Sequence, residues 1–261
     1  MDSSKILPVE IDTDKLNEIE HGLWRFPSTH IAIGKVASGK STFLHNLITR
    51  FWLPVFEDRI ILFSPTAMND PIIHDLIENN KIFINFDEYN YGILQRVLET
   101  IEEDDNPKHR YLIIWDDCLG MFANQMSHEG RMFNKFVANF RHIATEGKLT
   151  LYFSIQKFSQ LPNVLRCNAH YLYLLGVSSE KELKFYSEEL NAISNGSSDM
   201  FMQLYHQSKQ VKYDIAFLDF IKLRFMRNFN ELLHSENDDN LEINKENEEN
   251  KKENEENKNN D

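Results

Sequence analysis

The chain has 261 residues, a formal net charge of −13 and two cysteines, and 41% of its residues are hydrophobic. These residues suffice for a sizeable core, whereas two cysteines cannot form the disulfide framework of a small secreted domain. No apolar run reaches the roughly 18–20 residues of a membrane span, and no basic-then-apolar signal sequence is visible at the start. We therefore expect a protein that is neither secreted nor associated with a membrane.

The negative charge is unevenly distributed along the chain. Residues 236–261 hold 11 acidic residues, 4 lysines and no aromatic residue, so they carry −7 of the total. Such a segment cannot bury enough apolar surface to offset the entropy of ordering it. The sequence thus predicts an N-terminal lead-in over 1–28, a folded domain over 29–235 and a disordered acidic tail over 236–261. Because about half of the acidity lies in the tail, it does not exclude a nucleic-acid partner.

Short apolar runs alternate with helix-length segments along the folded domain. The expected strands are 30–33, 59–63, 81–86, 111–115, 150–155, 169–175 and 215–217. The expected helices are 40–51, 70–79, 91–103, 129–145 and 179–191, with a closing helix at 221–233 that turns Leu223, Phe225 and Met226 towards the core. This alternation predicts an α/β fold with a mostly parallel sheet flanked by helices.

A phosphate-binding loop follows the first expected strand. Residues 34–41 read Gly-Lys-Val-Ala-Ser-Gly-Lys-Ser and match the pattern G-x-x-x-x-G-K-[ST] between a strand and a helix. Backbone N–H groups of such a loop point at phosphate oxygens, and the helix adds its positive end. Lys40 is expected to contact the β- and γ-phosphates and Ser41 to bind Mg²⁺. The predicted nucleotide-binding residues are Gly34, Lys35, Val36, Ala37, Ser38, Gly39, Lys40, Ser41 and Thr42.

Two carboxylates, Asp116 and Asp117, follow the expected strand 111–115. A phosphate loop needs an acidic residue at the end of a neighbouring strand to hold Mg²⁺, and we assign that role to Asp116. Asp117 points in another direction and is expected to polarise the attacking water. Gln156 follows the next strand, where a polar side chain would sense the γ-phosphate. The paired acids favour hydrolysis of a nucleoside triphosphate over phosphoryl transfer to a small acceptor.

Four segments together carry a resemblance to a known family. They are 34–42, 112–117, Asn-Phe-Arg-His at 139–142, and Gln156 followed by Leu-Pro at 161–162 and Arg-Cys-Asn at 166–168. In these segments the chain resembles the poxvirus-type genome-packaging ATPases of the FtsK–HerA superfamily, found in large DNA viruses, virophages and related elements. The first two motifs are common to many ATPases, whereas the last two are much more specific. The similarity covers roughly residues 31–175.

The resemblance implies a RecA-like core of the P-loop (ASCE) class, homo-oligomeric rings and ATP-driven translocation of double-stranded DNA into a capsid. It implies Mg²⁺ as cofactor and ATP as substrate, with Lys40, Asp117, Gln156 and Arg141 as catalytic residues and Ser41 and Asp116 on the metal. A ring ATPase also needs a cation from a neighbouring subunit. Arg141 and Arg166 are the candidates, with Arg141 slightly preferred.

The implied partners and location follow from the same resemblance. DNA binding would be independent of base sequence, with capsid or portal-site proteins as further partners, at a viral assembly site in the host cytoplasm or in the virion. The basic residues available for DNA contact are Arg131, Lys135, Lys148, Lys157, Lys222, Arg224 and Arg227. None belongs to a dense basic run, and an ordinary solvated face also explains them.

Two other classes of function remain open from the sequence. A small-molecule kinase, such as a nucleoside or nucleotide kinase, would need an arginine-rich lid, and the span from Gly120 to Arg131 has no arginine before its end. A nucleotide-regulated scaffold with little turnover would not need the paired aspartates or Gln156. ATP hydrolysis measured with and without double-stranded DNA separates these classes.

Overall fold

The computed structural model describes residues 24–25, 27–79, 81–118, 127–143 and 149–235. The predicted tail, residues 1–23 of the predicted lead-in, Lys148 and most of the span examined for a kinase lid lie outside the described residues. Within them, Trp24 belongs to the predicted lead-in but packs on the domain. Its indole Nε1 donates to the Tyr173 hydroxyl at 2.8 Å, and its ring lies edge-on to Phe51 and Phe229.

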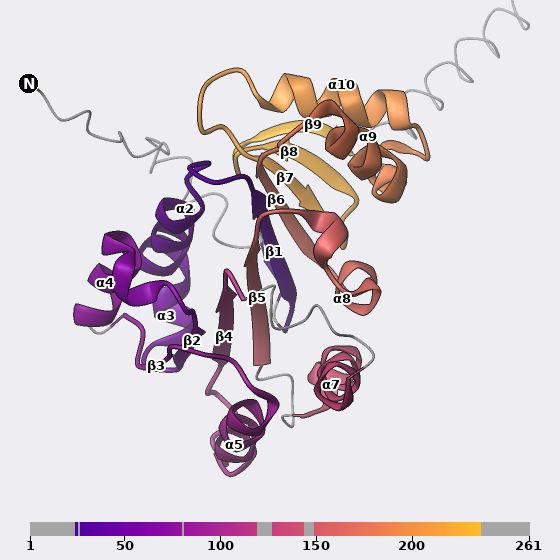
Figure 1. Cartoon of the computed structure of the whole chain (residues 1–261). Coiled ribbons are helices and arrows are strands. Elements are labelled where there is room, and N and C mark those ends of the chain that lie inside the picture. The colour runs from indigo at the N-terminus through magenta and orange to yellow at the C-terminus, as the bar shows by residue number, and fades with distance from the viewer. Residues whose placement is uncertain (1–23, 26, 80, 119–126, 144–148, 236–261) are drawn as a thin grey trace, which may run out of the picture.

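The described residues form one nine-stranded sheet with helices on both faces (Figure 1). The strand order is β3-β2-β4-β5-β1-β6-β7-β8-β9. Strands β3 to β6 in this order pair in parallel, and β6 to β9 pair antiparallel. The strands are β1 (Thr29–Gly34), β2 (Ile60–Phe63), β3 (Ile84–Phe86), β4 (Tyr111–Asp116), β5 (Leu149–Ile155), β6 (Tyr171–Gly176), β7 (Ala216–Asp219), β8 (Arg224–Arg227) and β9 (Glu231–Ser235). The predicted α/β class with a mostly parallel sheet is confirmed.

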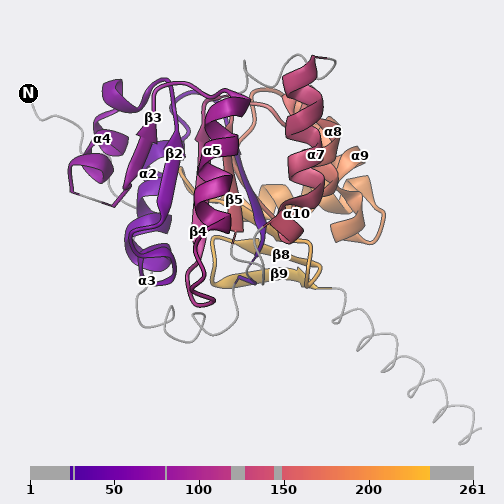
Figure 2. The same cartoon turned by 90° about the horizontal axis from the view of Figure 1, so that it is seen from below.

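The helices divide between the two faces of the sheet, as the views in Figures 1 and 2 show. Helices α2, α3 and α4 share one hydrophobic cluster with the sheet, and α5 with α7 to α10 share the other. They are α2 (Lys40–Leu47), α3 (Leu53–Phe56), α4 (Pro71–Glu78), α5 (Tyr91–Glu102), α7 (His128–Ile143), α8 (Asn163–Cys167), α9 (Glu180–Glu189) and α10 (Ser198–Ser208). A π-helical segment, Ile48–Trp52, joins α2 to α3 and covers the end of the expected helix 40–51.

Strand β1 illustrates why the parallel strands are rich in apolar residues. Its six residues are all buried. Ile31 and Ile33 belong to the cluster under α5 and α7 to α10, whereas Ala32 belongs to the cluster under α2 to α4. Successive side chains of a strand point to opposite faces, so a strand covered on both faces is apolar at most positions, and the polar Thr29 and His30 at the start of β1 are buried as well. This packing holds the end of β1 rigidly in the middle of the sheet.

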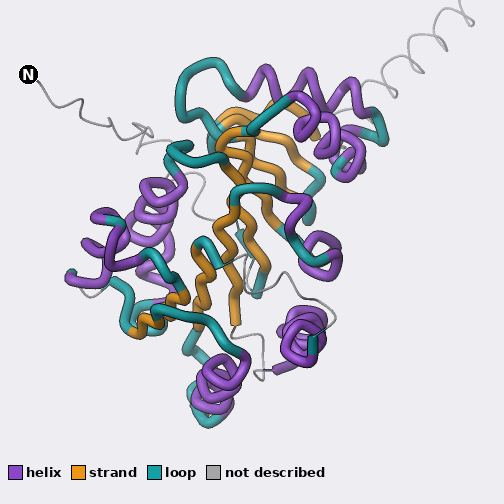
Figure 3. The backbone as a smooth tube through the Cα atoms, in the orientation of Figure 1, coloured by secondary structure: helices purple, strands orange, loops and turns teal. Residues whose placement is uncertain are grey.

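The predicted closing helix over 221–233 is wrong, because this segment forms the antiparallel strands β8 and β9, drawn as strands in Figure 3. Phe225 and Met226 are both buried, as expected, but they lie in different hydrophobic clusters on opposite faces of the sheet. Left-handed backbone conformations at Leu223 (φ 48°) and Asn228 (φ 53°) also interrupt any helix. Helix α10, which the sequence analysis did not identify, packs against β8 and β9.

Candidate nucleotide site

Three parallel strands, β1, β4 and β5, end at one edge of the sheet and carry most of the predicted site. Strand β5 pairs with β1 on one side and with β4 on the other. The acidic strand β4 is therefore not the neighbour of β1, and the sequence expectation of a directly neighbouring strand is wrong in this respect. The consequence is that Gln156, at the end of β5, lies between the phosphate loop and the two aspartates.

The segment from Gly34 to Gly39 forms a tight turn between β1 and α2. The Ser38 N–H donates to the Lys35 carbonyl at 3.1 Å, and Ala37 (φ 60°) and Gly39 (φ 91°) adopt left-handed conformations. At Gly34 a Cβ atom would lie 2.1 Å from the Ser38 Oγ and 3.0 Å from the Ser38 Cβ, so a side chain at this position would force Ser38 to move. The predicted phosphate loop is therefore a compact turn between a buried strand and a helix.

Lys40 reaches back across this loop from the first turn of α2. Its Nζ donates to the Gly34 carbonyl at 2.6 Å and to the Lys35 carbonyl at 3.3 Å. Burial lowers the pKa of Lys40 below its ordinary value, and the nearby carboxylates of Asp117 and Asp116 act in the opposite direction. The ammonium group is therefore held over the loop, within the electric field of both aspartates.

Asp116 is the last residue of β4, and only 6% of its surface is exposed. Burial raises the pKa of its carboxyl group, the carboxylates of Asp117 and Asp70 raise it further, and Lys40 opposes them. The Ser64 Oγ donates to Asp116 Oδ2 at 3.4 Å. A buried carboxylate with acidic neighbours and one partial counter-charge is a suitable ligand for a hard cation such as Mg²⁺.

Asp117 and Gln156 meet directly. The Gln156 Nε2 donates to Asp117 Oδ1 at 3.2 Å, and the Asp117 N–H donates to the Ser154 carbonyl at 3.2 Å. Asp117 has φ 53°, a conformation that costs free energy for a residue with a side chain. The turn after β4 is therefore held by two contacts from the end of β5.

Asp70 is a site residue that the sequence analysis missed. Its Oδ2 accepts a hydrogen bond from the Ser41 Oγ at 2.5 Å, and its Oδ1 accepts one from the Ile72 N–H at 2.9 Å. The second contact caps the amino end of α4. The sequence indicated a helix beginning near Asp70, but nothing in it indicated that this helix would begin beside the phosphate loop.

Ser41, the second predicted metal ligand, has Asp70 beside it. Among the described residues, no group of three or more His, Cys, Asp or Glu side chains forms a ready metal site. Proteins commonly bind Mg²⁺ through one or two carboxylates and the phosphates of a substrate. The oxygen donors of Ser41 and Asp116 fit such an ion.

A cavity of about 320 Å³ lies along the phosphate loop. Its lining comprises Ala37, Ser38, Gly39, Lys40, Ser41, Thr42, Asp70, Ile72 and Tyr213. The volume is at the lower end of the range for small-molecule sites. Most of the predicted loop residues are therefore brought together around one cavity, to which the fold adds three residues from distant parts of the chain.

The two candidate arginines are not part of this cavity. Arg141 is exposed at the end of α7. Burial, Arg141 and Arg25 lower the pKa of His170 to about 4, and His170 Nδ1 accepts the N–H of Thr29 at 3.0 Å, at the start of β1. Arg141 therefore lies towards the edge of the sheet opposite the phosphate loop, and within one chain it is remote from the predicted phosphates.

Arg166 has partners of its own. Its guanidinium forms an ion pair with Glu189 at 2.7 Å and lies 5.8 Å and 5.9 Å from the ring centroids of Phe158 and Phe185. These contacts join α8 to α9. Arg141, by contrast, lies 5.9 Å from the ring centroid of Phe140 and forms no ion pair among the described residues.

Two of the proposed DNA-contact residues have a structural role instead. Arg224 pairs with the fully buried Asp219 at 2.7 Å, and Arg227 pairs with the buried Asp214 at 2.9 Å. Removing either arginine would leave a buried carboxylate without its partner, which is costly. These two arginines therefore stabilise the antiparallel part of the sheet, and the interpretation of both as DNA contacts is weakened.

The sequence matches no protein-family model and no curated protein sequence. Solved structures do show the same fold. The DNA-packaging ATPase B204 from Sulfolobus Turreted Icosahedral Virus superposes with a TM-score of 0.55 at 13% identity, covering 78% of this chain and 98% of that one. The genome packaging NTPase B204 from Sulfolobus turreted icosahedral virus 2 in complex with ATP-gammaS gives a TM-score of 0.54 at 14% identity, covering 77% and 96%.

The fold and the loop define the class: this chain has the fold of a P-loop ATPase, with a mostly parallel sheet between two layers of helices. More particularly, it is the fold of the viral genome-packaging ATPases, the group that the sequence motifs also resemble. At 13 to 15% identity this likeness establishes the fold alone. In the described part of the chain, none of the helices is long and apolar enough to cross a bilayer.

Proposed function

We propose that this chain is a Mg²⁺-dependent ATPase that moves double-stranded DNA and packages a viral genome into a capsid. The observation that carries the proposal is the hydrogen bond of 3.2 Å from Gln156 to Asp117 at the edge that also bears Lys40. It links a candidate sensor of the γ-phosphate to the candidate base for the attacking water. That connection suits a motor, in which hydrolysis must be transmitted to the rest of the fold.

Each residue of the edge has a role in this proposal. The loop N–H groups bind the phosphates, Lys40 exchanges its carbonyl contacts for the β- and γ-phosphate oxygens, and Ser41 with Asp116 holds the metal. Mg²⁺, when bound, neutralises charge on the β- and γ-phosphates. Asp117 orients the water and accepts its proton, and Gln156 holds Asp117 and responds to loss of the γ-phosphate.

The packaging role rests on two supports. One is the resemblance in the Arg-His and Gln…Leu-Pro…Arg-Cys-Asn segments. The other is the shared fold with proteins described as a DNA-packaging ATPase and a genome packaging NTPase. We infer a homo-oligomeric ring that contacts DNA without reading its bases, with capsid or portal-site proteins as partners, in the host cytoplasm or the virion.

The decisive experiment measures ATP hydrolysis by the full chain with and without double-stranded DNA of unrelated sequences. We expect Mg²⁺-dependent release of phosphate that DNA stimulates irrespective of its sequence, and a stimulation that falls with salt because phosphate contacts release counterions. Transfer of phosphate to a nucleoside, without stimulation by DNA, would contradict the proposal in favour of a kinase. Absence of any turnover would favour a scaffold.

The inferred ring makes a separate prediction for Arg141. If Arg141 acts on the ATP site of a neighbouring subunit, Arg141→Ala and Lys40→Ala variants should each be inactive alone and should recover activity when mixed. In the mixture, an intact arginine meets an intact phosphate loop across the interface. Arg166→Ala is the matched comparison, because Arg166 is already paired with Glu189. Failure of the mixture to recover, with assembly intact, would exclude Arg141 as the trans-acting cation.

A further inference from the structure

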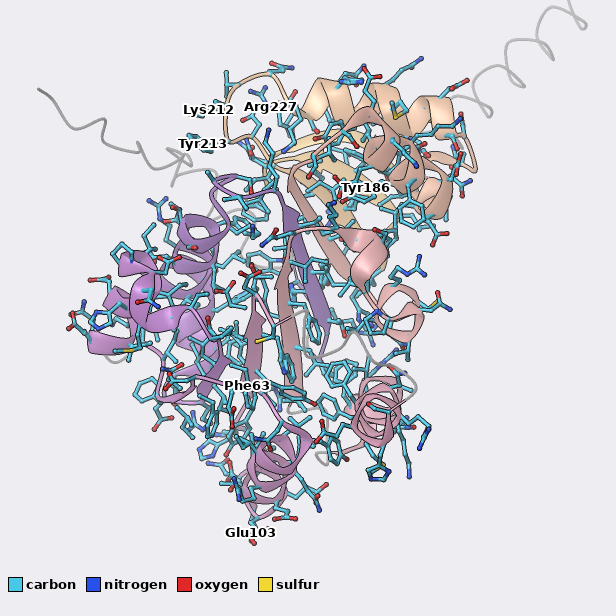
Figure 4. All side chains as sticks on the ribbon, in the orientation of Figure 1. Phe63, Glu103, Tyr186, Lys212, Tyr213 and Arg227 are labelled. Atoms are coloured by element: carbon cyan, nitrogen blue, oxygen red, sulfur yellow. The ribbon has the colours of Figure 1, made fainter. Side chains whose placement is uncertain are left out.

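Tyr213 lies against the phosphate loop although it is far from the loop in sequence. A Cβ atom on Gly39 would lie 3.4 Å from its Cδ1 and 3.8 Å from its Cε1. The edge of the ring therefore packs on the loop at the amino end of α2. Tyr213 also lines the cavity that contains Lys40, Ser41 and Asp70. Figure 4 shows Lys212, Tyr213 and Arg227 on and beside the segment that leads from α10 towards β7, next to the start of α2.

The described lining of the cavity combines charged side chains with one aromatic ring. Asp70 influences the Asp116 carboxyl group and contacts Ser41, so it lies where the metal and the terminal phosphates are proposed to bind. Tyr213 packs beside Gly39 and is the sole aromatic residue of the cavity's described lining. A nucleotide likewise combines charged phosphates with a flat aromatic base.

The position of Tyr213 is enforced by the surrounding structure. Its φ of 76° is unfavourable for a residue with a large side chain. The segment is nevertheless held in place: Asp214 Oδ2 accepts the Val211 N–H at 2.9 Å and the Arg227 Nε at 2.9 Å. Backbone strain that the surroundings maintain in this way is a recurring feature of ligand-binding sites.

Further contacts tie the same segment to the end of the central sheet. The Lys209 Nζ donates to the Leu174 carbonyl at 2.5 Å and also to the Asp214 carbonyl. Leu174 belongs to β6, which pairs with β1 up to Gly34 at the start of the phosphate loop. The ring of Tyr213 and the loop are therefore fixed to one rigid body.

Tyr213 differs in this respect from the tyrosines of the core. Tyr173, for example, is fully buried and its hydroxyl accepts the Trp24 Nε1–H. Tyr213 is half-exposed, and among the described residues no aromatic ring packs on it and its hydroxyl forms no hydrogen bond. The Lys212 Nζ lies 4.8 Å from its ring centroid, a cation–π distance that keeps a positive charge beside the cavity.

We propose that Tyr213 is the base-stacking residue of the nucleotide site and that it binds the purine of a nucleoside triphosphate by its ring face, with Lys212 beside it. This inference rests on the proposed nucleotide site and adds the recognition of the base. Stacking on an aromatic ring does not read the edges of a base. Tyr213 accordingly contributes affinity for purine nucleotides in general, with little preference for adenine over guanine.

The test compares ligands with and without a base, using the full chain and Mg²⁺. Binding of the non-hydrolysable analogues AMP-PNP and GMP-PNP and of inorganic tripolyphosphate is measured by calorimetry. Tyr213→Ala should weaken both analogues by about tenfold, the scale of one stacked base, and change tripolyphosphate binding by less than twofold. Tyr213→Phe should bind all three like the wild type. Tyr91→Ala is the matched control, since Tyr91 is half-exposed at the start of α5.

The results that would contradict the stacking role of Tyr213 differ from those that would contradict the proposed function. Unchanged affinity of Tyr213→Ala for both analogues would overturn the inference, and so would an equal loss for tripolyphosphate or a loss limited to AMP-PNP. If the wild type bound no nucleotide at all, the proposed function itself would fail. A Tyr213→Trp variant provides an independent readout: its added fluorescence should change with AMP-PNP but not with tripolyphosphate, and the reverse pattern would overturn the assignment.

Discussion

Two parts of the candidate nucleotide site are built in different ways. On the phosphate side, β1, β4 and β5 run parallel and bring Lys40, Asp116, Asp117 and Gln156 to one edge. On the other side, Tyr213 comes from a strained segment held by the antiparallel strands β7 and β8 and by Lys209. The comparison teaches that the charged and polar candidate residues lie at the ends of core strands or shortly after them. The proposed base contact instead lies on an irregular segment that separate hydrogen bonds hold in place.

The first prediction concerns the phosphate side. Lys40→Ala should lower ATP hydrolysis by about 10³-fold, because it removes the cation held over the loop. Steady-state phosphate release measures this effect. Lys181→Ala, on the exposed side of α9, is the control and should hydrolyse ATP like the wild type. Normal turnover in Lys40→Ala would refute the assignment of the phosphate loop.

The second prediction separates the two aspartates. Asp117→Asn should lower hydrolysis by roughly 10²-fold or more, as expected for loss of a general base, while ATP affinity stays within a few-fold and bound ATP is trapped. Asparagine retains the shape of the side chain beside Gln156. Single-turnover kinetics and nucleotide binding distinguish the steps, with the exposed Asp105→Asn as control. An equal loss of affinity would instead make Asp117 a metal ligand.

The third prediction concerns the support of the tyrosine side. Burial lowers the pKa of Lys209 to about 7, well below its ordinary value, and Asp214 opposes this. Between pH 7 and about 10 the unfolded lysine therefore keeps a proton that the folded one releases, so the free energy of unfolding should rise with pH, by up to about 4 kcal/mol.

Lys209→Met should lose this rise, which urea unfolding at several pH values measures. The exposed neighbour Lys212 provides the control, since Lys212→Met should retain the pH slope of the wild type. Identical pH slopes in the wild type and in Lys209→Met would contradict the buried position of the Lys209 ammonium and, with it, the anchoring of the segment that carries Tyr213.

The fourth and smallest effect is expected at Asp116. Its raised pKa means that the folded state disfavours the charged form, so the stability of the nucleotide-free protein should fall as pH rises above the ordinary pKa of an aspartate, about 3.9. Asp116→Asn should remove this cost and raise the melting temperature at pH 7 by about 2–4 °C, with loss of Mg²⁺-dependent hydrolysis. A lower melting temperature would mean that Asp116 stabilises the fold.

Much of the fold was predictable because its parallel strands are short and mostly apolar. Strands buried on both faces have a distinctive composition, and the helices between them have an apolar face, such as Phe133, Phe136 and Phe140 in α7. The failure at 221–233 has a physical cause as well. Three apolar residues within four positions fit either a helix or a strand between two layers, and the hairpin depends on pairing with β7, a contact between separate segments.

The candidate site likewise contains residues that a local sequence pattern predicts and residues that only the tertiary structure brings together. The sequence by itself predicted the candidate phosphate loop and the two aspartates, since the glycines of the loop and the acidic end of a strand are local patterns that a short segment carries wherever it folds. Only the tertiary structure decided that β5 separates β1 from β4, that Asp70 reaches Ser41, and that Tyr213 packs on Gly39. These contacts join residues remote in sequence, and no local propensity encodes them, because they arise when the sheet and its helices pack into one body.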